Sequence, residues 1–75
     1  MTKGKMSAGQ YEKALAALGL DHEQATELLD IDYRTSTRWV YGERDVPGPA
    51  ANFLRYLVAT GVSGADAIKV IKQKG

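Results

Sequence analysis

The sequence predicts an all-helical fold, a small bundle of five helices, and three observations support this prediction. Apolar residues recur at the spacing of one buried helical face, as in Tyr11, Ala14, Leu15 and Leu18. Residues that cap helices stand before these runs, and glycines stand after them. No segment alternates apolar and polar residues for long enough to indicate a strand.

The first two helices are marked by their caps. Ser7 and Gln10 form a capping box that opens the first helix, and Gly19 ends it. Asp21 is a suitable N-cap for the second helix, whose apolar face includes Leu28.

An acidic pair then separates the second helix from a third. Asp30 tolerates a left-handed conformation at a helix end, and Asp32 is expected to cap the next helix by accepting from backbone N–H groups. The third helix is expected to begin near Tyr33 and to end at Gly42, with Trp39 as its large apolar anchor. Its opposite side is polar and cationic.

Two further helices complete the chain. Pro49 suits the first turn of the fourth helix, and Gly61 ends it. Ser63 followed by Asp66 resembles a cap for the fifth helix, whose narrow apolar stripe consists of Ala65, Ile68 and Ile71. The residues expected in the core are Tyr11, Leu15, Leu18, Leu20, Leu28, Leu29, Ile31, Trp39, Phe53, Leu54, Leu57 and Ile68.

Length and composition indicate one domain. A chain of 75 residues has room for one small core, which we assign to residues 7–75, preceded by a flexible basic segment at 1–6. The absence of cysteine excludes disulfides and thiolate zinc sites. No apolar run has the length of a signal peptide or a membrane span, so we expect a cytoplasmic protein.

The net charge of +1 is unevenly distributed. Residues 7–32 carry one lysine against six acidic residues, whereas residues 33–75 carry seven basic residues against three acidic ones. A nearly neutral chain gains little affinity by neutralising phosphates, so DNA binding by two copies on adjacent half-sites is expected. The alternative, a solvated charge pattern without a partner, stays open.

The order and spacing of several short motifs resemble the phage repressor and Cro-like family of helix-turn-helix proteins, often labelled XRE-type. The similarity extends from about Ser7 to Val58. The motifs are Leu18-Gly19-Leu20, Thr35-Ser36-Thr37-Arg38-Trp39, Gly42-Glu43-Arg44 and Val46-Pro47-Gly48-Pro49. Three positions depart from the family pattern: Thr26, Asp30 and Ser36. Ser36 replaces a branched apolar residue, and Trp39 is expected to fill that space.

The resemblance implies a lambda-repressor-like bundle that regulates transcription. Such proteins are usually repressors that bind inverted repeats in double-stranded DNA as dimers. The resemblance further implies that this repressor belongs to a phage or a mobile element. Carried over position by position, it implies base or flanking contacts by Tyr33, Arg34, Thr37 and Arg38, and backbone contacts by His22, Thr35 and Arg44. Arg34 and Arg38 are the preferred base readers, although a solvated face is the alternative for both.

Other interpretations concern the partner surface and the class of protein. The stripe of the fifth helix, with Val62, Ile68 and Ile71, either forms a homodimer interface or simply covers the core. Trp39 is interpreted as packing rather than base stacking. An antitoxin or other helical adaptor that binds a protein partner is the second functional hypothesis. With no cysteine, one histidine and no phosphate-binding glycine loop, we expect no enzyme, metal or cofactor.

Overall fold

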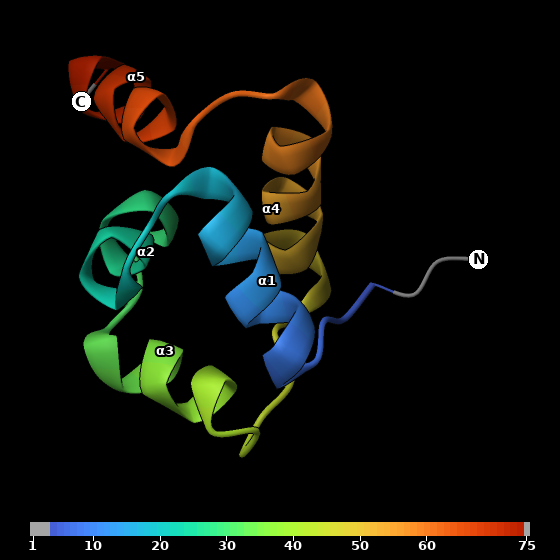
Figure 1. Ribbon diagram of the computed structural model, residues 1–75. Helices are drawn as coiled ribbons and strands as arrows, with labels where there is room; N and C mark the ends of the chain where they lie inside the picture. Colours follow the sequence, from blue (N-terminus) through green and yellow to red (C-terminus); the bar gives the residue numbers. More distant parts are fainter. Residues whose placement is uncertain (1–3, 75) are drawn as a thin grey trace.

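The computed structural model describes residues 4–74 and contains five helices, which confirms the all-helical prediction (Figure 1). They are α1 (Ala8–Leu18), α2 (His22–Leu29), α3 (Tyr33–Val40), α4 (Gly48–Thr60) and α5 (Gly64–Lys74). Within this described part, the extended backbone pairs at one isolated bridge, between Met6 and Val46. None of the described helices has the length and apolar character needed to cross a membrane.

Helix α1 lies at the centre of the fold and contacts α3, α4 and α5, while α2 contacts α3 and α5 (Figure 1). In Figure 1, α3 and α5 lie at opposite ends of the molecule. The buried apolar residues are Met6, Tyr11, Ala14, Leu15, Leu18, Leu20, Ala25, Leu28, Trp39, Val46, Ala51, Leu54, Leu57 and Ala67. Four residues expected in the core lie at its edge and are only partly buried: Leu29, Ile31, Phe53 and Ile68.

The helix caps agree closely with the sequence. The backbone N–H of Gln10 donates to Ser7 Oγ at 3.3 Å, and its side-chain Oε1 accepts from the Ser7 N–H at 2.9 Å. Asp21 and Gln24 form the same reciprocal box at the start of α2. Ser63 Oγ accepts from the backbone N–H of Asp66 at 3.2 Å, as its spacing predicts.

Helix α3 ends at Val40, two positions earlier than expected, because Gly42 closes it from outside. With φ of 77°, Gly42 is in the left-handed region that glycine enters without strain. Its N–H donates to the Trp39 carbonyl at 3.2 Å, and the next N–H, of Glu43, donates to the Arg38 carbonyl at 2.9 Å. This pair of bonds is the Schellman arrangement, which satisfies the last carbonyls of the helix.

The segment expected to be flexible begins outside the described residues, but residues 4–6 contact the body of the domain. Met6 and Val46 exchange two backbone hydrogen bonds, of 3.0 and 2.9 Å. The Arg55 side chain donates to the carbonyl oxygens of Gly4 and Lys5, each at 2.9 Å. The packed domain therefore includes residues before Ser7.

Helix α5 is held by a close approach at its first residue. Gly64 is buried against Leu20, and a Cβ atom built on Gly64 would overlap that side chain. Ala67 is also buried, and Lys72 Nζ lies 2.7 Å from Glu27 Oε2 of α2. Small residues on α5 thus allow it to cover the core.

Candidate nucleic-acid interface

The inner face of α3 is fixed by contacts with α1. Ser36 is fully buried, and its Oγ lies 2.8 Å from Tyr11 Oη, so that each hydroxyl has the other as a hydrogen-bond partner. The Trp39 ring meets the Tyr11 ring edge-on, with centroids 5.4 Å apart. Tyr11 therefore occupies the space beside Ser36 that we had expected Trp39 to fill.

Burial raises the pKa of the Tyr11 hydroxyl. The hydrogen bond with Ser36 opposes this shift, and the nearby negative charge of Glu12 adds to it. The hydroxyl therefore stays neutral inside the fold over the range in which proteins usually function, and the hydrogen bond persists.

The opposite face of α3 is open to solvent. Tyr33, Arg34 and Arg38 are exposed, and Thr37 is partly buried. The Thr37 hydroxyl donates back to the Tyr33 carbonyl at 2.9 Å, which leaves its oxygen free to accept from another donor. With its inner face anchored, α3 presents this cationic and aromatic surface in one orientation.

Tyr41 extends the same surface beyond the end of the helix, and its side chain is 74% exposed. The sequence prediction did not include Tyr41, because the resemblance places the DNA contacts in the first turns of the helix. Its position, four residues after Thr37 and on the same side, is the signal that identifies it.

A cationic hollow adjoins this surface. The residues that line it are Lys5, Thr35, Arg38, Trp39, Arg44, Asp45 and Pro47, and its volume is about 540 Å³. The lining thus includes three basic residues and one acidic residue, Asp45. The structure brings three of the predicted site residues, Thr35, Arg38 and Arg44, to one hollow, together with Lys5 from the N-terminal segment.

The loop after α3 brings Arg44 to the hollow because it folds back on the helix end. The Arg38 carbonyl accepts from the backbone N–H of Glu43, and that of Arg44 lies 3.4 Å from the same oxygen. Val46 is then held by its bridge with Met6. This path brings Arg44 and Lys5 to the same hollow as Arg38.

His22 lies elsewhere, in acidic surroundings. Its Nε2 is 3.8 Å from Glu12 Oε2, and it lines a separate hollow with Asp21, Glu23 and Tyr33. One N–H of the α2 N-terminus is already bonded to the Asp21 carboxylate, at 2.8 Å. These carboxylates oppose an anion at this position, so His22 does not belong to the cationic cluster.

The acidic turn between α2 and α3 corrects one expectation. Asp30 takes the left-handed conformation that we predicted, with φ of 56°. Asp32 occupies the N-cap position of α3, but within residues 4–74 its side chain makes no capping hydrogen bond. Its backbone alone begins the helix, by accepting from the Ser36 N–H at 3.2 Å. The exposed carboxylate therefore remains a negative charge at the start of α3.

Comparisons of the chain with protein-family models, with curated proteins and with solved structures give no match.

Proposed function

We propose that this chain is a sequence-specific DNA-binding regulator of transcription, in which α2 and α3 form a helix-turn-helix and α3 enters the major groove. The observation that carries the proposal is the combination of an exposed face on α3, which includes Arg34, and the adjoining hollow that Lys5, Arg38 and Arg44 line. Base readers beside a phosphate-binding cluster are what such a helix needs. The resemblance to XRE-type repressors supports the same assignment.

The two groups of side chains have different roles in this proposal. Arg34 and Thr37 face base edges, with Tyr33 and Tyr41 at either end of the reading surface. Arg44 binds a phosphate, and Arg38, which belongs to both groups, lies at the boundary between base and backbone. An arginine contacts guanine through two parallel hydrogen bonds, whereas a phosphate contact carries no sequence information.

Selection of bound duplexes from a random DNA pool tests this proposal, because recovered sites reveal both sequence preference and the symmetry of half-sites. For the selected site, we expect Arg34→Ala to lose about 1 to 3 kcal/mol and to relax the preference at one base position. Arg44→Ala, its control, weakens all sequences alike. The DNA function is rejected if no sequence is enriched, and the base-reading role of Arg34 is rejected if its variant weakens all sequences equally.

We further propose that the regulator acts as a homodimer on an inverted repeat. Ile68 packs against the core of its own chain, whereas Val62 and Ile71 remain 37% and 42% exposed. The exposed pair therefore replaces Ile68 as the better candidate for a contact between copies. Sedimentation of Ile71→Glu with and without operator DNA tests this, since an unchanged dimer excludes that contact.

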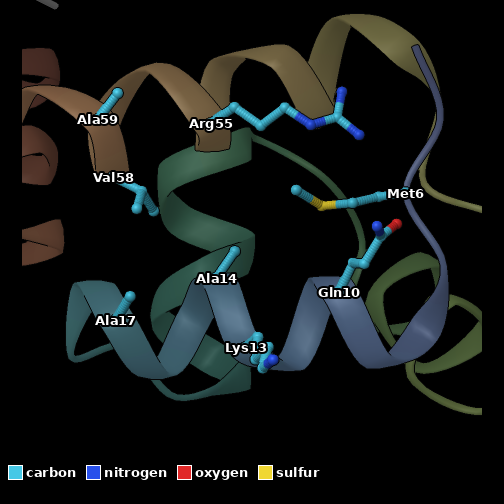
Figure 2. Close-up of a pocket in the computed structure, with 8 residues that line it drawn as sticks. All are labelled: Met6, Gln10, Lys13, Ala14, Ala17, Arg55, Val58 and Ala59. Carbon is cyan, nitrogen blue, oxygen red and sulfur yellow. The ribbon is translucent and has the colours of Figure 1, made fainter. Parts of the chain in front are cut away.

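A second candidate function, binding a protein partner as an antitoxin or adaptor does, is favoured by a groove between α1 and α4. Its volume is about 480 Å³, and its lining comprises Met6, Gln10, Lys13, Ala14, Ala17, Arg55, Val58 and Ala59. Figure 2 shows small side chains on facing sides of the two helices, with Met6 reaching between them. Its described charged lining residues, Lys13 and Arg55, are both basic. An apolar segment that carries carboxylates fits this chemistry.

One variant separates the two functions. Ala17 is exposed in the groove and distant in sequence from α3, so Ala17→Glu adds bulk and a negative charge where an acidic segment would bind. If DNA regulation is the main activity, this variant represses a reporter gene as well as the unmodified chain does. A variant that loses repression while keeping full affinity for purified DNA supports the partner function instead.

A further inference from the structure

The N-terminal segment at residues 4–6 is fixed by two independent sets of hydrogen bonds. On one side, Met6 and Val46 form the bridge that joins this segment to the loop after α3. On the other, Arg55 of α4 donates from Nη1 to the Gly4 carbonyl and from Nη2 to the Lys5 carbonyl, each at 2.9 Å. The backbone of Lys5 is therefore held from both directions.

The Arg55 side chain is oriented for this contact by a hydrogen bond within α4. Its Nη1 also donates to Asn52 Oδ1, one turn earlier on α4, at 3.0 Å. In Figure 2 its side chain extends along α4 toward the end of the helix nearest the N-terminal segment. Because a guanidinium presents several N–H groups in a rigid plane, one side chain can satisfy two carbonyls and an amide together.

With its backbone held, Lys5 lines the cationic hollow, as Arg38 and Arg44 do. These three cations come from three separate parts of the chain, and the hollow they line also includes the Thr35 hydroxyl. The lining also includes the Asp45 carboxylate, so three cations stand against one negative charge, and this excess of positive charge favours a bound anion. An oxygen-rich anion with negative charge fits both the ammonium and the guanidinium groups.

We propose that Lys5 is a phosphate-binding residue of the DNA interface and that Arg55 is the positioning residue that holds it there. The ligand is a backbone phosphodiester of duplex DNA, bound jointly by Lys5, Arg38 and Arg44. This inference rests on the proposed DNA binding and extends the interface to the N-terminal segment. A chain of low net charge thereby concentrates its cations at one phosphate.

The salt dependence of affinity for a duplex of random sequence tests this proposal. Each phosphate contact contributes about 0.9 to the slope of log affinity against log salt. Lys5→Gln should lower that slope by at most about 1, because Arg38 and Arg44 remain on the shared phosphate. Lys69→Gln, on α5 at the opposite end of the molecule, removes the same charge and should leave the slope unchanged.

Arg55→Lys tests the positioning role, since it keeps the charge but lacks the planar fork that bonds to both carbonyls. We expect this variant to lower the slope as Lys5→Gln does, and the double variant to lower it no further. Thermal unfolding followed by circular dichroism verifies that each variant is folded. If Arg55→Lys unfolds, Lys5→Gln still decides the phosphate role, because Lys5 is exposed.

The outcomes distinguish this proposal from the one on which it rests. An unmodified chain without affinity for duplex DNA rejects the DNA function itself. If the duplex binds and Arg44→Ala lowers the slope while Lys5→Gln does not, the DNA function stands and the role of Lys5 is rejected. If Arg55→Lys is folded and its slope of log affinity against log salt equals that of the unmodified chain, only the positioning role of Arg55 is rejected.

Discussion

The hydroxyl groups of Tyr11 and Ser36 lie 2.8 Å apart in the core and join the N-terminal half of α1 to the inner face of α3. Both residues are fully buried, and neither hydroxyl reaches water. Because α3 carries the proposed base readers on its other side, this bond fixes the rotation of that surface relative to the rest of the domain. The stability of the fold and the orientation of the proposed reading surface are thereby linked at one pair of atoms.

Removal of either hydroxyl should therefore destabilise the fold. Tyr11→Phe and Ser36→Ala each leave one buried hydroxyl without its partner, which costs about 1 to 3 kcal/mol in the free energy of unfolding. The double variant leaves neither hydroxyl, so its loss in the free energy of unfolding should be smaller than the sum of the losses of the two single variants. Urea denaturation of all four proteins measures this coupling. Strictly additive costs would show that the two hydroxyls do not interact.

The raised pKa of Tyr11 predicts a loss of stability at alkaline pH. The folded state retains the tyrosine proton at a pH where the unfolded chain, with its ordinary pKa of about 10, releases it. This contribution is therefore fully present below about pH 10 and is lost as the pH rises from there through the folded pKa. Tyr11→Phe should show a shallower alkaline decline in the free energy of unfolding.

Tyr56→Phe is the matched control for this pH effect, because Tyr56 is 63% exposed. Its alkaline decline should follow that of the unmodified chain in urea denaturation series between about pH 8 and 11. If the free energy of unfolding of Tyr11→Phe falls as steeply with rising pH as that of the control, other titrating groups cause the alkaline loss of stability.

The helix boundaries were largely predictable, because caps such as Ser7 and Asp21 act through residues only three positions away. The partner of Ser36 was not, since Tyr11 lies 25 positions earlier in the chain. A serine at an inward position indicates only that a polar partner or water is needed. Which residue supplies it depends on how α1 crosses α3, and local spacing does not encode that crossing.

The close packing of Gly64 is a second long-range contact that local spacing does not encode. Sequence spacing suggests an ordinary residue after the Ser63 cap, but Gly64 is buried against Leu20. Gly64→Ala should lower the free energy of unfolding by about 1 to 3 kcal/mol, because the added methyl group forces α5 away from the core. Gly9→Ala, in open space on α1, should raise it by about 0.5 to 1 kcal/mol. Thermal unfolding compares the two, and equal stabilisation by both would contradict the close approach.

The candidate site was predictable in part. The face of α3 follows from helical spacing once Trp39 is placed inside, so Arg34 and Arg38 could be selected from the sequence. Lys5 could not be placed, because its position depends on the bond from Arg55, 50 residues later. A basic residue near a chain end resembles a solvated tail until a long-range contact holds it.

Asp32 is exposed at the start of α3, and within residues 4–74 its carboxylate makes no capping hydrogen bond. Next to DNA this charge repels phosphates, whereas Asn has the same shape and an equal N-cap preference. Asp32→Asn should therefore bind duplex DNA more tightly than the unmodified chain, with a gain that shrinks as salt screens the repulsion. Its free energy of unfolding should fall by no more than about 1 kcal/mol, the favourable interaction of a carboxylate with a helix N-terminus.

Asp66→Asn is the control for Asp32, since it removes the same charge from α5, at the opposite end of the molecule from α3 (Figure 1). Both variants raise the net charge equally, so any general electrostatic gain appears in both. Titration of a fluorescent duplex at low and high salt then isolates the local effect of Asp32. An equal gain in both variants would place α3 away from the phosphates, whereas a gain specific to Asp32→Asn places the start of α3 beside them.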